Sequence, residues 1–254
     1  MSDEVLVEHS GGVTVITINR PRARNAVNRA VSDGIAAALE EFEARRDLVA
    51  AVITGAGGTF CSGMDLKAFV AGENVMHPDR GFAGIAHRPP RKPTIAAVEG
   101  HALAGGCEIA LACDLIVAAE DARFGIPEVK RGLVAGAGGL LRLPRRVPYG
   151  VAMRLALTGD LLTAPEAERH GLVTELTAPG KALKGALALA SSIAANAPLA
   201  VAATKEIIAS SAAWSPDEAF DRQNEIIQPV LFSADAREGA TAFAEKRPPA
   251  WRGE

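Results

Sequence analysis

The composition of this chain is that of a globular protein, and it excludes several other classes. Of the 254 residues, 48% are hydrophobic and 22% are charged, so the chain can bury a core without disulfide or metal support. The formal net charge is −3, and no basic run alternates with aromatic residues, so we expect no nucleic-acid partner. The longest apolar stretch, residues 94–119, contains Glu99, His101, Glu108 and Asp114. These ionisable groups exclude a membrane span there, and we expect no membrane partner.

The cysteines and the first residues indicate a cytoplasmic protein. Cys61, Cys107 and Cys113 lie in apolar stretches and cannot all pair, so we expect reduced, buried thiols. The N-terminal MSDEVLVEH is acidic and polar, unlike a signal peptide.

The first elements in chain order are a hairpin, a helix and a buried strand. Residues 5–9 and 13–18 predict a β-hairpin around a Gly-Gly turn, and residues 19–26 predict a loop. Apolar positions at helical spacing over 29–45 predict an amphipathic helix. The apolar run at 49–54 predicts a buried strand, and a glycine-rich turn follows it.

The middle of the chain begins with residues 72–92, which are rich in Pro, Gly, His and Arg. We expect a variable loop there that can include a short helix. After it, the pattern predicts a buried strand over 94–100, a helix over 103–113 and another strand over 114–119. Residues 122–129 predict a short extended piece that ends in a turn.

The last part of the chain is expected to be mostly helical. Helices dominate from Gly136 onward, with one strand-like piece at 172–176, and the final helices are expected at 198–211, 216–232 and 235–246. Repeated strand–strand–helix units followed by a helical tail predict an α/β core with a helical C-terminal part.

One glutamate, Glu108, interrupts the small and apolar run HALAGGCEIALACDL. Its neighbours cannot replace the hydration that a buried carboxylate loses. Gly105 lies three residues earlier on the same helix face, in the first turn, where backbone N–H groups lack helical partners. A free N–H with a carboxylate one turn deeper suits an oxygen that becomes negative while a proton moves nearby. The alternatives are a buried glutamate paired with arginine or capped by backbone, and glycines needed for close helix packing.

The glycine-rich turn GAGGTFCSGMDL, residues 55–66, lacks both the GxxxxGK[ST] and the GxGxxG phosphate-binding patterns. It could present the backbone N–H near Met64 to a ligand. The alternative is a tight turn without a ligand.

A second carboxylate, Glu128, lies in the segment FGIPEVKRGLVAGAGG. Taken alone, it is typical of a solvated turn. Together, Glu108 and Glu128 could give and take protons at one reacting centre. Other chemistries have less support: the five histidines show no metal-ligand spacing, and Ser62 is not in a GxSxG motif.

These motifs, in this order, resemble the enoyl-CoA hydratase/isomerase (crotonase) family along essentially the whole chain. The segments that carry the resemblance are NRPRARNA, GAGGTFCSGMDL, EGHALAGGCEIALACDLIVA, ARFGIPEVKRGLVAGAGG, LTGDLLTAPEAERHGLV and FAEKRPP. Their order and nearly ungapped spacing make the combination specific.

The resemblance implies an α/β fold in two parts. Residues 1–197 would form a crotonase-like spiral of ββα repeats that holds the acyl-CoA site, and residues 198–254 a C-terminal helical trimerisation region. It also implies a homotrimer, or a hexamer of two trimers, and a coenzyme A thioester as substrate. It implies no metal or redox cofactor, since coenzyme A is part of the substrate.

The family's catalytic residues match five positions of this sequence. The two oxyanion-hole amides match Met64 and Gly105, and the two glutamates match Glu108 and Glu128. Gly136 matches the glycine whose N–H helps to hold the water.

The positions that match the family's coenzyme A contacts lie in four regions of the chain. They are Arg24, Ala26, Met64, Asp65, Leu66, Lys67, Gly105, Phe243 and Lys246. Of these, Phe243 and Lys246 match tail residues that can reach the coenzyme A of a neighbouring subunit.

The reaction that the resemblance implies is the reversible addition of water to the 2,3-double bond of a 2-enoyl-CoA. An enoyl-CoA isomerase needs only one glutamate, so the presence of both favours hydration. A dehydratase of a polar, carnitinyl-type acyl-CoA is an alternative, and a non-catalytic acyl-CoA-binding protein is a weaker one. Lys130 and Arg131 replace residues that are often apolar in fatty-acyl hydratases, which leaves the acyl chain open.

Overall fold

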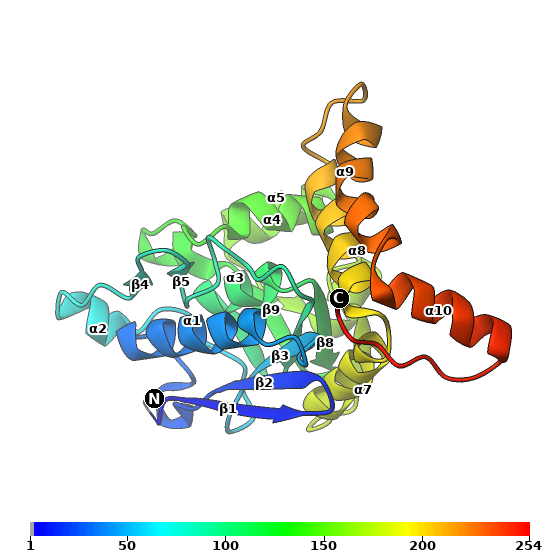
Figure 1. The fold of residues 1–254 in the computed structure, drawn as a ribbon. Helices are drawn as coiled ribbons and strands as arrows, with labels where there is room; N and C mark the ends of the chain where they lie inside the picture. The colour runs from blue at the N-terminus through cyan, green and yellow to red at the C-terminus, as the bar shows by residue number, and fades with distance from the viewer. Residues whose placement is uncertain (1–2) are drawn as a thin grey trace.

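The computed structural model describes residues 3–254, which form an α/β core with a group of C-terminal helices extending from it (Figure 1). The strands are β1 (Val5–Ser10), β2 (Val13–Ile18), β3 (Ala50–Gly55), β4 (Met76–His77), β5 (Gly81–Phe82), β6 (Thr94–Val98), β7 (His101–Leu103), β8 (Leu115–Ala119), β9 (Arg123–Gly125), β10 (Leu162–Thr163) and β11 (Glu175–Thr177). The α-helices are α1 (Arg29–Ala44), α2 (Leu66–Val70), α3 (Gly105–Ala112), α4 (Gly139–Arg146), α5 (Tyr149–Thr158), α6 (Ala164–Arg169), α7 (Ala182–Ala194), α8 (Pro198–Ser211), α9 (Ala219–Leu231) and α10 (Ala234–Glu245). The 3₁₀ helices are η1 (Pro21–Ala23) and η2 (Pro127–Arg131).

The largest sheet has the strand order β1-β2-β3-β6-β8-β11. Its first two strands form the predicted antiparallel hairpin, and the remaining neighbours are parallel. Both faces of β3 are buried, because Ala50 and Val52 pack toward α7 while Ala51 and Ile53 pack into the main core. This explains why the strand reads as a continuous apolar run.

The chain alternates between this sheet and a smaller one with the order β10-β9-β7. Strand β6 lies in the large sheet, β7 in the small one, and α3 follows; β8 and β9 repeat the same step before η2. This repetition confirms the spiral of ββα units expected from the resemblance.

Most predicted elements are confirmed, with shifted ends. The helix expected over 103–113 begins at Gly105, because residues 101–103 pair with β9 as strand β7. The strand expected over 172–176 is limited to Glu175–Thr177, where it pairs with β8.

The region 72–92 is more firmly held than the expected variable loop. It contains the β4–β5 hairpin, and the short helix, α2, precedes it. The Arg80 side chain is only 1% exposed, and its Nη2 donates to Glu43 Oε2 on α1 at 2.6 Å. A Cβ atom at Gly84 would lie 2.4 Å from the Ser32 carbonyl oxygen of the same helix. These contacts fix the hairpin against α1.

The C-terminal helices keep apolar side chains exposed within the chain. No residue of α8 or α9 is buried in the part described, residues 3–254. Ile208, Phe220 and Phe232 are 71%, 74% and 78% exposed. The region is nevertheless attached to the core, since Lys205 Nζ lies 2.6 Å from Asp114 Oδ2.

Within residues 3–254, no single helix is both long enough and apolar enough to cross a membrane. Helices α7 and α8 together have the required length and composition, but the chain bends by 109° between them.

Helix α3 approaches the glycine-rich segment so closely that its second residue has no room for a side chain. A Cβ atom at Gly106 would lie 2.1 Å from the Cys61 carbonyl oxygen. The Cys61 N–H in turn donates to the His101 carbonyl at 2.9 Å. The contact therefore involves backbone that cannot move without disturbing β7.

We expect Gly106→Ala to lower the free energy of unfolding by about 2 kcal/mol or more, because the methyl group overpacks this contact. Gly150→Ala is a matched control, since Gly150 lies in α5 with nothing within 4 Å of its Cβ position. The control should be neutral or slightly stabilising. Chemical denaturation measures both changes, and an undiminished stability of Gly106→Ala would contradict the packing argument.

Candidate active site

The Glu108 carboxylate is buried and held by backbone N–H groups. The residue is 3% exposed, and its Oε1 accepts hydrogen bonds from the N–H groups of Ala137 and Gly139, both at 2.8 Å. Burial raises the pKa of Glu108, although these two N–H groups and the Arg142 guanidinium counteract part of the rise. The backbone-capped glutamate considered from the sequence is therefore present, but the cap occupies one oxygen. Within residues 3–254 no protein group donates to Oε2.

The turn that holds Glu108 has a glycine, Gly139, at one of its two points of contact. A Cβ atom at Gly139 would lie 3.0 Å from Glu108 Oε1, so a larger residue would push the carboxylate away. Gly138 has a φ of 93°, a left-handed conformation that favours glycine. Gly136 lies in the same turn, three residues before α4 begins at Gly139.

Glu128 lies on η2, and one of its oxygens is enclosed. Its Oε2 is buried without a hydrogen-bond partner among the described residues. Burial raises the pKa of Glu128 to about 7, and the negative charge of Glu108 adds to the rise. The solvated-turn interpretation is therefore wrong for Oε2, which is enclosed by the protein.

The structure brings the backbone around Met64 next to the start of α3. Val27 and Met64 form a parallel bridge in which the Val27 N–H donates to the Gly63 carbonyl at 2.8 Å and the Asp65 N–H donates to the Val27 carbonyl at 2.9 Å. In a parallel pairing of this kind, the N–H of Met64 points away from Val27. A Cβ atom at Gly63 would lie 3.1 Å from the Gly105 nitrogen, so the two segments are in contact.

Gly105 is the first residue of α3, and its N–H has no helical partner for that reason. The residue before it, Ala104, has a φ of 51° and a ψ of −128°. Its N–H is fixed by the Gly125 carbonyl at 2.9 Å. On the other side, a Cβ atom at Gly105 would lie 2.5 Å from Cε1 of Phe82. The close packing considered for this glycine is therefore present together with a free N–H.

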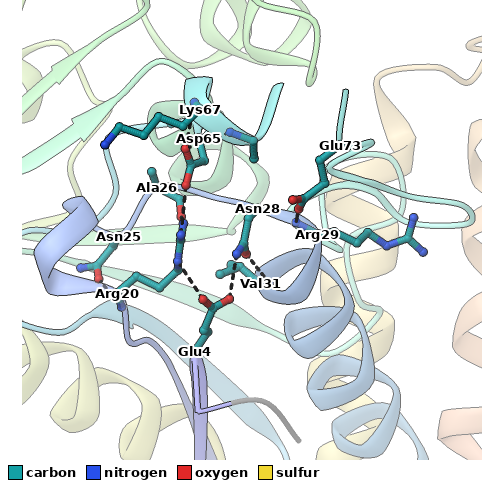
Figure 2. Close-up of polar contacts among 12 residues, drawn as sticks. Glu4, Arg20, Asn25, Ala26, Asn28, Arg29, Val31, Asp65, Lys67 and Glu73 are labelled. Atoms are coloured by element: carbon teal, nitrogen blue, oxygen red, sulfur yellow. Dashed lines mark hydrogen bonds and ion pairs between the residues drawn. The ribbon is translucent and has the colours of Figure 1, made fainter. Parts of the chain in front are cut away.

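The segments expected to contact coenzyme A are joined by Arg20, which the sequence did not single out. Figure 2 shows its guanidinium between Glu4, the Ala26 carbonyl and Asp65. Arg20 Nη2 lies 3.0 Å from Asp65 Oδ2. Burial alone would raise the pKa of Asp65, but Arg20 and two backbone N–H groups hold it below its usual value. The Asp65 side chain also caps α2 through the Lys67 N–H at 3.0 Å.

Asn25 holds the same loop through side-chain hydrogen bonds, and the sequence did not single it out either. It is fully buried, its Nδ2 donates to the Ala56 and Thr59 carbonyls at 2.8 and 2.7 Å, and its Oδ1 accepts from the Arg20 N–H at 2.9 Å. Arg24, with a φ of 51°, directly precedes it. An asparagine beside an arginine-rich turn is the only signal that the sequence offers.

The structure does not bring every expected residue together within one chain. Leu66 and Lys67 lie at the start of α2, beside the Ala26 loop. Phe243 and Lys246 lie at the far end of α10, which projects away from α2 and α3 (Figure 1). Phe243 is 88% exposed, so within the chain it has little packing.

The described residues contain no group of three or more His, Cys, Asp or Glu side chains arranged to hold a metal ion. The three cysteines are buried and unpaired, and burial raises the pKa of each thiol to about 12. They are packing residues, as expected from the sequence.

Known proteins similar to this chain identify its family. The family model for enoyl-CoA hydratase/isomerase matches residues 8–254. The chain is 42% identical over 253 residues to the enoyl-CoA hydratase EchA19 of Mycobacterium tuberculosis, covering 97% of this chain and 95% of that protein. It is 41% identical to the carnitinyl-CoA dehydratase of Salmonella arizonae, with 100% of each chain covered.

The fold is also that of solved structures. The crystal structure of an enoyl-CoA hydratase from Mycobacterium tuberculosis H37Rv has a TM-score of 0.98 and 60% sequence identity, with 100% of each chain covered. Because the family model and these relatives span nearly the whole chain, the protein is an enzyme with the crotonase fold and belongs to the enoyl-CoA hydratase/isomerase family.

Proposed function

We propose that the protein adds water reversibly across the 2,3-double bond of a 2-enoyl-CoA thioester. The observation that carries this proposal is the pair Glu108 and Glu128. Two backbone N–H groups cap the Glu108 carboxylate, whereas Glu128 has one buried oxygen without a hydrogen-bond partner among the described residues, and the charge of Glu108 raises its pKa. Two groups of this kind can accept and deliver protons in one site.

The thioester oxygen would lie between the N–H groups of Met64 and Gly105. As water attacks C3, negative charge develops on this oxygen, and preformed N–H donors stabilise it. The contact between Gly63 and the Gly105 nitrogen supports a shared site for the two donors. Loss of one such donor typically costs on the order of 10² to 10³ in rate.

Glu108 and Glu128 would hold the attacking water between them, with Gly136 in the adjoining turn. Glu128, with a pKa of about 7, is largely neutral below that pH and can deliver a proton to C2. Glu108 accepts two backbone hydrogen bonds, which favour its anionic form. We therefore assign Glu108 as the base toward water, with the two titrations coupled.

Coenzyme A would lie along the loop and helix that Arg20 joins. The proposed contacts within one chain are Arg24, Ala26, Met64, Asp65, Leu66, Lys67 and Gly105. Phe243 and Lys246 would contact the coenzyme A of a neighbouring copy, in agreement with their distance from this chain's own site.

We also propose that residues 198–254 mediate assembly into a trimer, or a hexamer of two trimers, around the core of residues 1–197. The exposed apolar side chains of α8 and α9 support an interface there. The cytoplasmic location and the expectation of no metal or redox cofactor stay predictions.

A dehydratase of a polar, carnitinyl-type acyl-CoA is the second candidate function. The 41% identity with a carnitinyl-CoA dehydratase over full length favours it almost as strongly as the identity with EchA19 favours hydration of other enoyl chains. The same site would serve both reactions, so the acyl group decides between them. An isomerase or a non-catalytic binder would need only one glutamate or neither.

We expect Glu108→Gln and Glu128→Gln each to lower hydration of crotonyl-CoA or longer 2-enoyl-CoAs at least 100-fold, roughly the contribution of a proton-transfer group. Loss of the enoyl-thioester absorbance measures the rate. Glu120→Gln, at an exposed position on the surface, is the control and should retain the wild-type rate. Near-normal turnover of either variant would remove that glutamate from the mechanism, and carnitinyl-type and 3-enoyl thioesters test the alternatives.

The pKa of Glu128 predicts a pH-dependent stability. The folded-state value of about 7 lies above the usual 4.5, so its contribution to stability is complete below about pH 4.5 and is lost as pH rises through about 7. Glu128→Gln stays neutral at every pH. We expect its melting temperature to equal that of the wild type at pH 4.5 and to exceed it by a few degrees at pH 8. If the difference in melting temperature between Glu128→Gln and the wild type were the same at both pH values, the enclosed position of the carboxyl group would be contradicted.

The proposed assembly predicts that charge on the exposed C-terminal faces breaks the oligomer. Phe220→Asp and Phe232→Asp should give smaller particles by light scattering, because each places a carboxylate in a desolvated contact. Val70→Asp, at an 84% exposed position on α2, should leave the particle size unchanged. An unaltered oligomer in both phenylalanine variants would exclude this surface as the interface.

A further inference from the structure

The guanidinium of Arg142, on α4, links the turn that holds Glu108 to the β4–β5 region. Its Nη1 donates to the Ala137 carbonyl at 3.2 Å, and its Nη2 donates to the Ala86 carbonyl at 2.6 Å. The Ala137 N–H donates to Glu108 Oε1 at 2.8 Å. Ala137 is therefore held by Arg142 through its carbonyl while it holds Glu108 through its N–H.

The turn is shaped to fit between the guanidinium and the carboxylate. A Cβ atom at Gly138 would lie 2.2 Å from Arg142 Nη1, so the guanidinium rests against the bare Cα of this glycine. A Cβ atom at Gly139 would lie 3.0 Å from Glu108 Oε1 on the other side. Two neighbouring glycines thus let a cation and an anion approach one turn of backbone.

The second hydrogen bond of Arg142, to Ala86, extends the link toward Gly105, whose N–H is one of the two proposed oxyanion-hole donors. Ala86 donates its N–H to the Phe82 carbonyl at 3.1 Å. The Phe82 ring packs against Gly105, the first residue of α3. The Arg142 guanidinium therefore contacts both the turn that holds Glu108 and the segment around Phe82 that packs on the start of α3.

We propose that Arg142 is a positioning residue: it fixes the 136–139 turn against Glu108 and keeps that carboxylate anionic, as a base toward water must be. This inference rests on the proposed hydration. Arg142 acts through the Ala137 backbone and through its charge, without contact to the substrate.

The charges around Glu108 support this role. Burial raises its pKa, and within residues 3–254 Arg142 is the one cation whose charge opposes the rise. The negative charge of Glu108 in turn raises the pKa of Glu128, on η2. Strand β6 carries no titratable side chain, and β7 carries only the exposed His101. Arg145 and Arg146 repel the Arg142 charge along α4.

The test compares Arg142→Gln, which removes the charge, with Arg142→Lys, which keeps the charge but cannot reproduce the forked hydrogen bonds. Loss of the positive charge should raise the pKa of Glu108. We therefore expect Arg142→Gln to move the acid limb of the pH profile of kcat/KM to higher pH by about one unit, which is the smaller of the pKa changes that a nearby opposite charge usually causes. Arg142→Lys should keep the limb in place while kcat falls about tenfold. Arg145→Gln, on the same helix and exposed, is the matched control and should change neither.

An infrared titration of the protonated carboxyl band that Glu108→Gln abolishes gives a second readout without turnover. The band should persist to higher pH in Arg142→Gln than in wild type, and an unchanged titration would overturn the proposal. If the wild type hydrates no enoyl-CoA, the proposed function fails, but this titration still tests Arg142. If Arg142→Gln does not fold, Arg142→Lys decides, because a moved acid limb with the charge retained contradicts the proposal.

Discussion

The structure depends on keeping one carboxylate, that of Glu108, away from water without leaving it unpaired. An ionised carboxylate in an apolar interior is costly unless hydrogen-bond donors replace its hydration. Here the donors are two backbone N–H groups of a turn whose contact points carry no interfering side chain. Such donors are fixed by the path of the chain, so the spiral of strands and helices must place α3 and the turn before α4 face to face. The small residues of the first turn of α3 and of the 136–139 turn meet this requirement.

Both proposed amide donors are backbone N–H groups that the path of the chain leaves free. Met64 turns its N–H away from Val27 because the bridge uses its two neighbours, and Gly105 has a free N–H because it begins a helix. Neither donor needs a side chain of its own. Arg20 and Asp65 act one layer further out, where their ion pair ties the Ala26 loop to the start of α2.

The sequence predicted those parts of the fold and of the site in which a residue differs clearly in character from its neighbours. Glu108 stands out because it is a carboxylate within an apolar run, and β3 stands out because both of its faces are buried. Arg20 and Arg142 lie in arginine-rich segments, NRPRAR and RLPRR, where nothing in the spacing tells which side chain turns inward. The order of residues 72–92 was missed for a related reason. Gly, Pro and Arg mark exposed loops, yet here Gly84 and Arg80 serve close contact and a buried ion pair.

Ala104 has a further consequence. Its φ of 51° and ψ of −128° belong to a region that residues with a side chain rarely adopt, and a conformation of this kind costs on the order of 1–3 kcal/mol. A glycine would remove that strain, but it would also let the peptide before Gly105 rotate more freely. The alanine methyl group therefore lowers the free energy of unfolding, but it also narrows the range of orientations that the Gly105 N–H bond can adopt. The orientation of one backbone N–H group at the start of α3 thus depends on a strained, non-glycine residue directly before it.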